Sequence, residues 1–131
     1  MNIIKKIVTV AGLATLVTLA ACSPAITEEK VAGRWQYTNA DVMIAFSPDG
    51  SGEEVSDGER FEFEWALVGA NEIEMTFVGD SEGSQIQKVK DTPFHGEYLE
   101  VFAIKLNRKN QLVLSDAHDH GHFELIFKMV E

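Results

Sequence analysis

The residues best suited to direct chemistry form a histidine-rich segment near the end of the chain. His118, His120 and His122 alternate within residues 116–122, and two aspartates lie among them. Imidazoles are good ligands for Zn²⁺ and Cu²⁺, and alternate residues of an extended segment point to the same side. A closed zinc site usually has four ligands, and this segment offers at most three histidines and a carboxylate. We therefore expect either modest zinc or copper binding, or a solvated loop that changes charge between about pH 5 and 8.

A second group of ionisable side chains consists of Glu62, Glu64, Glu72 and Glu74. A catalytic carboxylate pair requires a cleft and surroundings that separate the two pKa values. These glutamates instead alternate with apolar residues, which predicts one solvated face of a sheet. The sequence also contains no nucleophile elbow, phosphate-binding glycine loop or metalloprotease motif. We expect no enzymatic activity and no catalytic residues.

The only cysteine, Cys22, ends the sequence Leu-Ala-Ala-Cys at residues 19–22. Two lysines precede an uncharged segment over residues 7–21, which is the order of charge and hydrophobicity in a secretory signal. This segment is shorter than the roughly 20 residues of a membrane-spanning helix. The region resembles bacterial lipoprotein precursors, in which a signal peptide is removed before a lipidated cysteine. The resemblance implies that residues 1–21 are removed and that Cys22 is the lipid-attachment residue.

The same resemblance implies a location in the cell envelope. Ser23, directly after the cysteine, resembles the signal for the outer membrane, so in a Gram-negative source the protein would face the periplasm. Several acyl chains would hold it durably, because one chain alone binds a membrane only marginally. Residues 22–30 are polar and predict a lipidated N-terminus with a short tether. Residues 31–131 remain for a single domain.

Acidic residues dominate the composition. The 131 residues include 21 Asp and Glu against 11 Lys and Arg, with a formal net charge of −10. Removal of Lys5 and Lys6 with the signal peptide would leave 9 basic against 21 acidic residues, a net charge of −12. This argues against nucleic acid as a partner and favours basic proteins, cations or neutral ligands. With Cys22 lipidated, the fold would have to be stable without disulfides.

From Val31 onward, apolar and polar residues mostly alternate, which predicts β-strands. Residues 61–67 and 72–77 are the clearest, and the short turn between them predicts an antiparallel hairpin. Residues 85–90 alternate poorly and predict an edge strand, a bulged strand or an irregular connection. Further strands are predicted around residues 35–37, 44–46, 52–56, 98–106, 112–114 and 123–129, with Tyr98 and Met129 among the residues that face inward.

Eight or nine short strands without a convincing helix predict an all-β fold, an antiparallel meander that closes into a barrel of about eight strands. Side chains can fill such a barrel, or it can hold one small ligand. Large inward-facing aromatic residues would leave little free volume. These residues are Trp35, Phe46, Phe61, Phe63, Trp65, Phe77, Phe102, Phe123 and Phe127.

Two short motifs carry a second resemblance. The Gly-Arg-Trp sequence at residues 33–35 is similar to the Gly-x-Trp motif of lipocalins. Phe46, Asp49, Gly50 and Gly52 resemble a turn in small bacterial lipocalin-like domains, which often follow lipoprotein signals. The chain is shorter than classical lipocalins and lacks their long helix and disulfide. The resemblance implies a lipocalin-like barrel without a deep ligand cup.

Two functions of different classes fit these features. One is a lipid-anchored, lipocalin-like domain that binds a small apolar or amphipathic ligand in the barrel mouth. The other is an envelope interaction or inhibitor-like module with a filled barrel, whose acidic surface contacts a basic envelope protein. The free volume of the barrel interior distinguishes these two functions, because an apolar pocket of about 300 Å³ or more at the barrel mouth would favour ligand binding.

Overall fold

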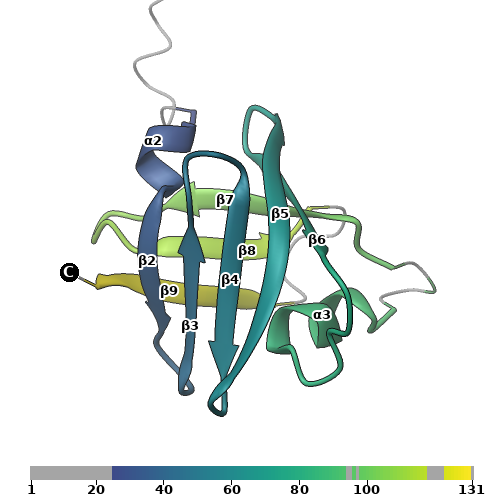
Figure 1. The fold of residues 1–131 in the computed structure, drawn as a ribbon. Helices are drawn as coiled ribbons and strands as arrows, with labels where there is room; N and C mark the ends of the chain where they lie inside the picture. The colour runs from purple at the N-terminus through teal and green to yellow at the C-terminus, as the bar shows by residue number, and fades with distance from the viewer. Residues whose placement is uncertain (1–24, 94–95, 97, 118–122, 131) are drawn as a thin grey trace, which may run out of the picture.

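The computed structural model describes residues 25–93, 96, 98–117 and 123–130. Eight antiparallel strands, each paired with the next, form a meander, and pairing of the first strand with the last closes it into a barrel (Figure 1). This confirms the predicted all-β fold and strand order. The closed barrel is consistent with a lipocalin-like fold.

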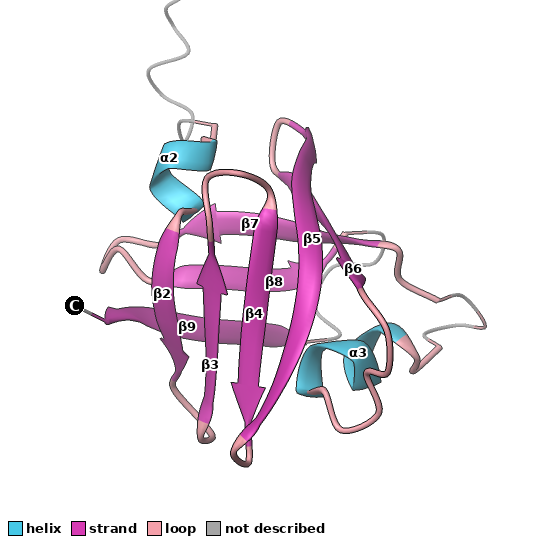
Figure 2. Ribbon diagram, in the orientation of Figure 1, coloured by secondary structure: helices cyan, strands magenta, loops and turns pink. Residues whose placement is uncertain are grey.

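Two short helices accompany the strands (Figure 2). Helix α2 lies at the start of the first strand, and helix α3 lies in the connection between the fifth and sixth strands, towards the opposite end of the barrel. No helix among the described residues is long and apolar enough to span a membrane. The elements are α2 (Glu28–Val31), β2 (Gly33–Tyr37), β3 (Val42–Phe46), β4 (Ser51–Ser56), β5 (Glu59–Gly69), β6 (Glu72–Phe77), α3 (Gln85–Lys90), β7 (Val101–Leu106), β8 (Leu112–Asp116) and β9 (Glu124–Val130).

Strand β5 shows how the alternating sequence produces the barrel wall. Phe61, Phe63 and Trp65 are buried, whereas Glu62 and Glu64 between them are exposed. Successive side chains of a strand point to opposite faces, so the apolar set enters the core and the glutamates meet water. Strand β6 pairs antiparallel with β5, which confirms the predicted hairpin.

Aromatic side chains fill much of the barrel interior. The ring of Phe46 packs edge-on against Phe63 and Trp65, with centroid distances of 5.6 and 5.3 Å. Phe63 also contacts Phe77 at 5.3 Å. The largest fully buried side chains are Trp35, Phe63, Phe102, Phe127, Ile44, Ile73, Met75, Ile86, Ile104, Leu112, Leu114 and Glu54.

The turn between β3 and β4 explains the second lipocalin-like motif. Gly50 has a φ of +93°, which a residue with a side chain rarely adopts. The indole Nε1 of Trp65 donates hydrogen bonds to the carbonyl oxygens of Ser47 and Ser51, at 3.0 and 2.9 Å. Gly52 is required because a Cβ there would collide with the Phe63 ring. The motif therefore shapes the turn and makes room for the core.

The prediction for residues 85–90 is wrong, because they form helix α3 and not a strand or an irregular connection. Ser84 begins the helix as its N-cap, and its Oγ accepts a hydrogen bond from the Gln87 amide. Ile86 and Val89, three residues apart, both turn towards the core. That spacing fits one face of a helix, which explains their poor alternation.

The predicted tether is also too long. Thr27 caps helix α2, Ile26 is buried, and Val31 is completely buried. The indole Nε1 of Trp35 donates a hydrogen bond to the Val31 carbonyl at 2.9 Å, which ties α2 to the barrel. Residues 26–30 therefore belong to the folded domain.

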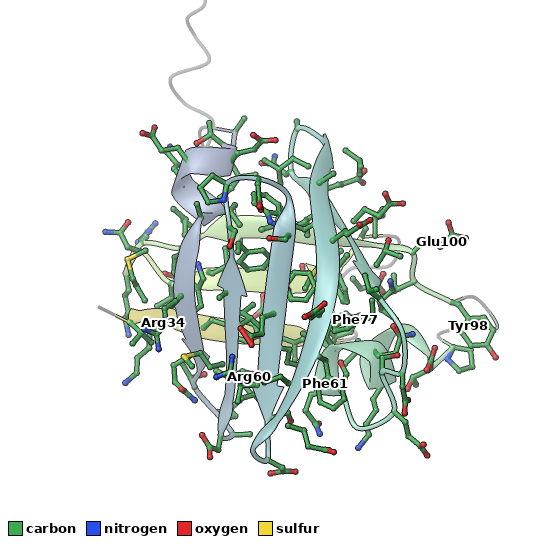
Figure 3. All side chains as sticks on the ribbon, viewed as in Figure 1. Arg34, Arg60, Phe61, Phe77, Tyr98 and Glu100 are labelled. Carbon is green, nitrogen blue, oxygen red and sulfur yellow. The ribbon has the colours of Figure 1, made fainter. Side chains whose placement is uncertain are left out.

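Two residues predicted to face inward are exposed. Tyr98 is 61% exposed because β7 begins only at Val101, and Figure 3 shows its ring on the segment that runs away from the barrel. Met129, on β9, is 53% exposed. It keeps the inward phase of Phe127 but lies next to the end of its strand, where its sulfur-bearing side chain is near Gly33.

Candidate functional site

The residues predicted for lipid and metal binding, Cys22, His118, His120 and His122, lie outside the described residues. Within the described part of the chain, no group of three or more His, Cys, Asp or Glu side chains is arranged to hold a metal ion. Other residues form the candidate sites of the described part of the chain.

A strongly acidic surface lies on the outside of β4, β5 and β6. Five carboxylates form this surface, which we call the acidic face: Asp49, Glu53, Glu62, Glu64 and Glu74. Strand pairing sets their spacing, since Glu53 lies directly opposite Glu62 and Ser51 lies opposite Glu64. On the other side of β5, Thr76 is the partner of Glu64 and Glu74 is the partner of Ala66. Alternation along three adjacent strands thus brings the four glutamates to one side of the barrel wall. Asp49 joins them from the turn before β4, where it lines the same hollow as Glu64 and Glu74.

Two hollows lie on the acidic face. One has a volume of about 380 Å³ and is lined by three of the carboxylates, Asp49, Glu64 and Glu74, together with small residues such as Gly50 and Ala66. The other has a volume of about 600 Å³ and lies over β4 and β5, with Glu53, Glu62 and Glu64 in its lining. Small side chains between the glutamates leave these hollows open to a partner.

Positive charge compensates the acidic face only in part. The guanidinium of Arg60 forms an ion pair with Glu53, with an Nη1–Oε2 distance of 2.6 Å (Figure 3). This pair relieves the repulsion expected between Glu53 and Glu62, which lie directly opposite each other. The Arg60 side chain is 73% exposed, so water screens the pair and its effect on stability is small.

Asp49 is held in its ionised form by the neighbouring turn. The Ser51 hydroxyl and the Ser51 amide donate hydrogen bonds to its carboxylate, at 2.6 and 2.9 Å. These bonds favour the charged form and lower the pKa of Asp49 below the usual 3.8. This part of the acidic face therefore keeps its negative charge in mildly acidic solution.

Lys90, the last residue of α3, lies near the edge of the acidic face. Its ammonium group donates a hydrogen bond to the Met75 carbonyl of β6. Burial lowers the pKa of Lys90 below the usual 10.5, and the carboxylates of Glu74, Asp91 and Glu100 act in the opposite direction. Lys90 thus links α3 both to the backbone of β6 and to the charge of the face.

The sequence did not lead us to Glu54 as a candidate functional residue. Its side chain is on the inner side of β4 and is completely buried. The carboxylate accepts hydrogen bonds from the Ser84 hydroxyl at 2.6 Å and from the amides of Gln85 and Ile86 at 2.7 and 3.3 Å. Glu54 lies on the same face of β4 as Gly52 and Ser56. The signal lies in the strand pairing, because Glu54 is the partner of Ile44 and Gly52 is the partner of Phe46, which places this face in the core.

A further hollow lies against the outside of the barrel wall near α2. A hollow of about 380 Å³ is lined by Ala25, Ile26 and Lys30 near α2 and by residues of β7. Among these, Ala103 and Lys105 alternate with the buried Phe102 and Ile104, so they face outward. This hollow is a surface groove between the N-terminal segment and the wall.

Fold and sites together define a small, closed, eight-stranded antiparallel β-barrel with an aromatic core and an acidic outer face. Comparison with known protein families finds no family model that matches the chain. A search of curated proteins finds no match either.

Proposed function

We propose that the protein is a lipid-anchored envelope protein whose barrel is an interaction module, and that its acidic face binds a basic protein. The observation that carries this proposal is the gathering of Asp49, Glu53, Glu62, Glu64 and Glu74 on one outer surface beside two hollows. Arg60 compensates one of these charges through its ion pair with Glu53.

Carboxylates this close together create a negative potential that a basic partner would neutralise. Such a potential raises association rates and suppresses binding of acidic proteins. Its range in solution is set by the Debye length, about 8 Å at physiological ionic strength. Binding to the acidic face should therefore weaken steeply as salt is added.

The filled interior supports this function over storage of a ligand inside the closed barrel. Aromatic side chains such as Phe63 and Phe102 occupy the centre, with at most 1% of their surface exposed. Interiors packed in this way leave few voids larger than a water molecule. The groove beside α2 is a surface feature and offers less enclosure than small-molecule sites usually provide.

The anchor in this proposal is Cys22, as the lipoprotein-like sequence implies. The first buried residue of the folded domain is Ile26. Four residue steps separate it from Cys22, and at about 3.5 Å per residue they span at most roughly 14 Å. The barrel would then lie close to the membrane, and the partner would be another component of the envelope.

Photo-crosslinking in cells tests the docking surface. A photoreactive amino acid at position 64 should capture a basic envelope protein, and the same amino acid at position 124, an exposed residue of β9, should not. With the captured protein purified, the double replacement Glu62→Lys with Glu64→Lys should slow association at low salt by about tenfold or more. Glu124→Lys is the matched control. Capture from both positions, or equal effects of the two charge reversals, would contradict the proposal.

The lipid anchor has its own test. Intact-protein mass spectrometry should give a chain that begins at residue 22 and carries the mass of the acyl groups. Cys22→Ala should leave the precursor uncleaved and without lipid. A native protein that retains Met1 and an unmodified thiol would refute the anchor without affecting the docking surface.

A further inference from the structure

The barrel wall is incomplete between β6 and β7, and α3 completes it. Strand β6 continues to Phe77, but its pairing with β7 covers only Glu72, Ile73 and Glu74. Beyond this pairing, the Met75 carbonyl receives its hydrogen bond from the Lys90 side chain of α3. Helix α3 therefore takes the place of a neighbouring strand at this edge.

The inner end of α3 is held by the buried carboxylate of Glu54. Within the described part of the chain, every hydrogen bond that this carboxylate accepts comes from residues 84–86. Its cross-strand neighbours, Ile44 and Phe61, are apolar. A buried carboxylate is tolerated only when donors or a positive charge accompany it. If α3 moved away, Glu54 would require a new partner with these properties.

Helix α3 is also a short element. It has six residues, too few for a helix that is stable without tertiary contacts. Ile86 and Val89 provide its contacts with the core, and its last residue, Lys90, is only half buried. Short elements with few buried contacts open more readily than the strands of a core. Movement of α3 would leave the eight-stranded ladder itself paired.

We propose that α3 can leave the wall and that the vacated space binds an amphipathic molecule with a primary ammonium group and a short apolar chain. The ammonium group would replace the donors that Ser84, Gln85 and Ile86 now offer to Glu54. The apolar chain would replace the side chains of Ile86 and Val89. In the closed barrel, α3 thus occupies the space that this molecule would fill. This site is separate from the acidic face and does not depend on the proposed docking function.

Titration with hexylammonium and hexanoate tests the site. The full chain is placed in lipid nanodiscs, and empty nanodiscs correct for partition of the probes into lipid. Calorimetry should show saturable binding of hexylammonium with one site per chain and no binding of hexanoate. Hydrogen–deuterium exchange should become faster in residues 85–90 when hexylammonium is bound, because the probe displaces α3.

Two substitutions should change the affinity in opposite directions. Glu54→Gln keeps the size of the side chain but removes the charge, and it should weaken hexylammonium binding by about tenfold or more. Ser84→Ala removes the helix cap and one donor, so the open state becomes more populated and the apparent affinity should rise by about fivefold. Glu124→Gln, at an exposed residue of β9 outside both proposed sites, should change neither quantity.

Several results would overturn the proposal. These are the absence of hexylammonium binding, equal binding of hexanoate, and binding that leaves the exchange of residues 85–90 unchanged. A decrease in hexylammonium affinity in both Ser84→Ala and Glu54→Gln would show that the two substitutions weaken binding only by destabilising the folded protein. If Glu54→Gln fails to fold, the gain expected for Ser84→Ala still decides the outcome.

Discussion

Replacing Gly52 with alanine should destabilise the barrel, although it adds only one methyl group. Gly52 lies on the inner side of β4, and a Cβ there would overlap the ring of Phe63 and approach the Ala45 carbonyl oxygen to 2.8 Å. The ring cannot easily move away, because Phe46 and Phe77 pack against it. The added carbon must therefore displace either the aromatic core or the backbone of β3.

The expected magnitude follows from two opposing effects. Overpacking a core typically costs about 1–3 kcal/mol. Loss of glycine's flexibility in the unfolded chain returns about 0.4–1 kcal/mol. A net destabilisation of about 1–2 kcal/mol should lower the Tm by about 5–10 °C in a domain of this size. Urea unfolding followed by tryptophan fluorescence should show a lower midpoint with an unchanged slope.

Gly69→Ala is the matched control, since both glycines lie in strands and neither has a positive φ. At position 69 the added Cβ would meet only the flexible side chain of Glu72, at 3.2 Å or more. Combining Gly52→Ala with Phe63→Leu should cost about 1 kcal/mol less than the sum of the single changes. If Gly52→Ala is as stable as the unmodified protein, or if the double variant shows no such coupling, the packing argument is wrong.

Three further changes probe other contacts. Trp65→Phe should cost about 1–2 kcal/mol in urea unfolding, because the carbonyls of Ser47 and Ser51 lose their shared indole donor; an unchanged midpoint would contradict this. Asp49 has a folded-state pKa below 3.8, so its stabilisation is present above that value and is lost as the pH falls through the folded-state pKa. In Asp49→Asn, the free energy of unfolding should therefore depend less steeply on pH in this acidic range. An equally steep dependence in urea unfolding at several acidic pH values would argue against this role of Asp49. Lys90 has a folded-state pKa below 10.5, so the unfolded chain binds more protons in the interval between the two values and stability rises with pH across it. Unfolding measured at several alkaline pH values should show that Lys90→Met removes this rise, and an identical pH profile would refute the assignment.

The acidic face was largely predictable from local sequence, and the site at α3 was not. Glu62, Glu64 and Glu74 alternate with buried residues, so their outward direction follows from the geometry of a strand. Glu53 joins them only through the pairing of β4 with β5, and Asp49 joins them through the turn before β4. The isolated alternation of β4 does not reveal that its inner face carries a carboxylate. Glu54 enters the core because donors from a helix 30 residues later are available to it.

Most strands, their buried faces and the tight turns can be predicted from the sequence, because these features depend on residues a few positions apart. The two-residue period of β5 and the Pro-Asp-Gly turn before β4 are sufficient for such predictions. The helical conformation of residues 85–90 cannot be predicted in this way, because this short segment depends on contacts with Glu54, the core and the Met75 carbonyl. The exposed position of Tyr98 likewise follows from tertiary structure, because β6 and β7 pair over just three residues. Contacts between residues far apart in the sequence stabilise these features, so local sequence patterns do not predict them.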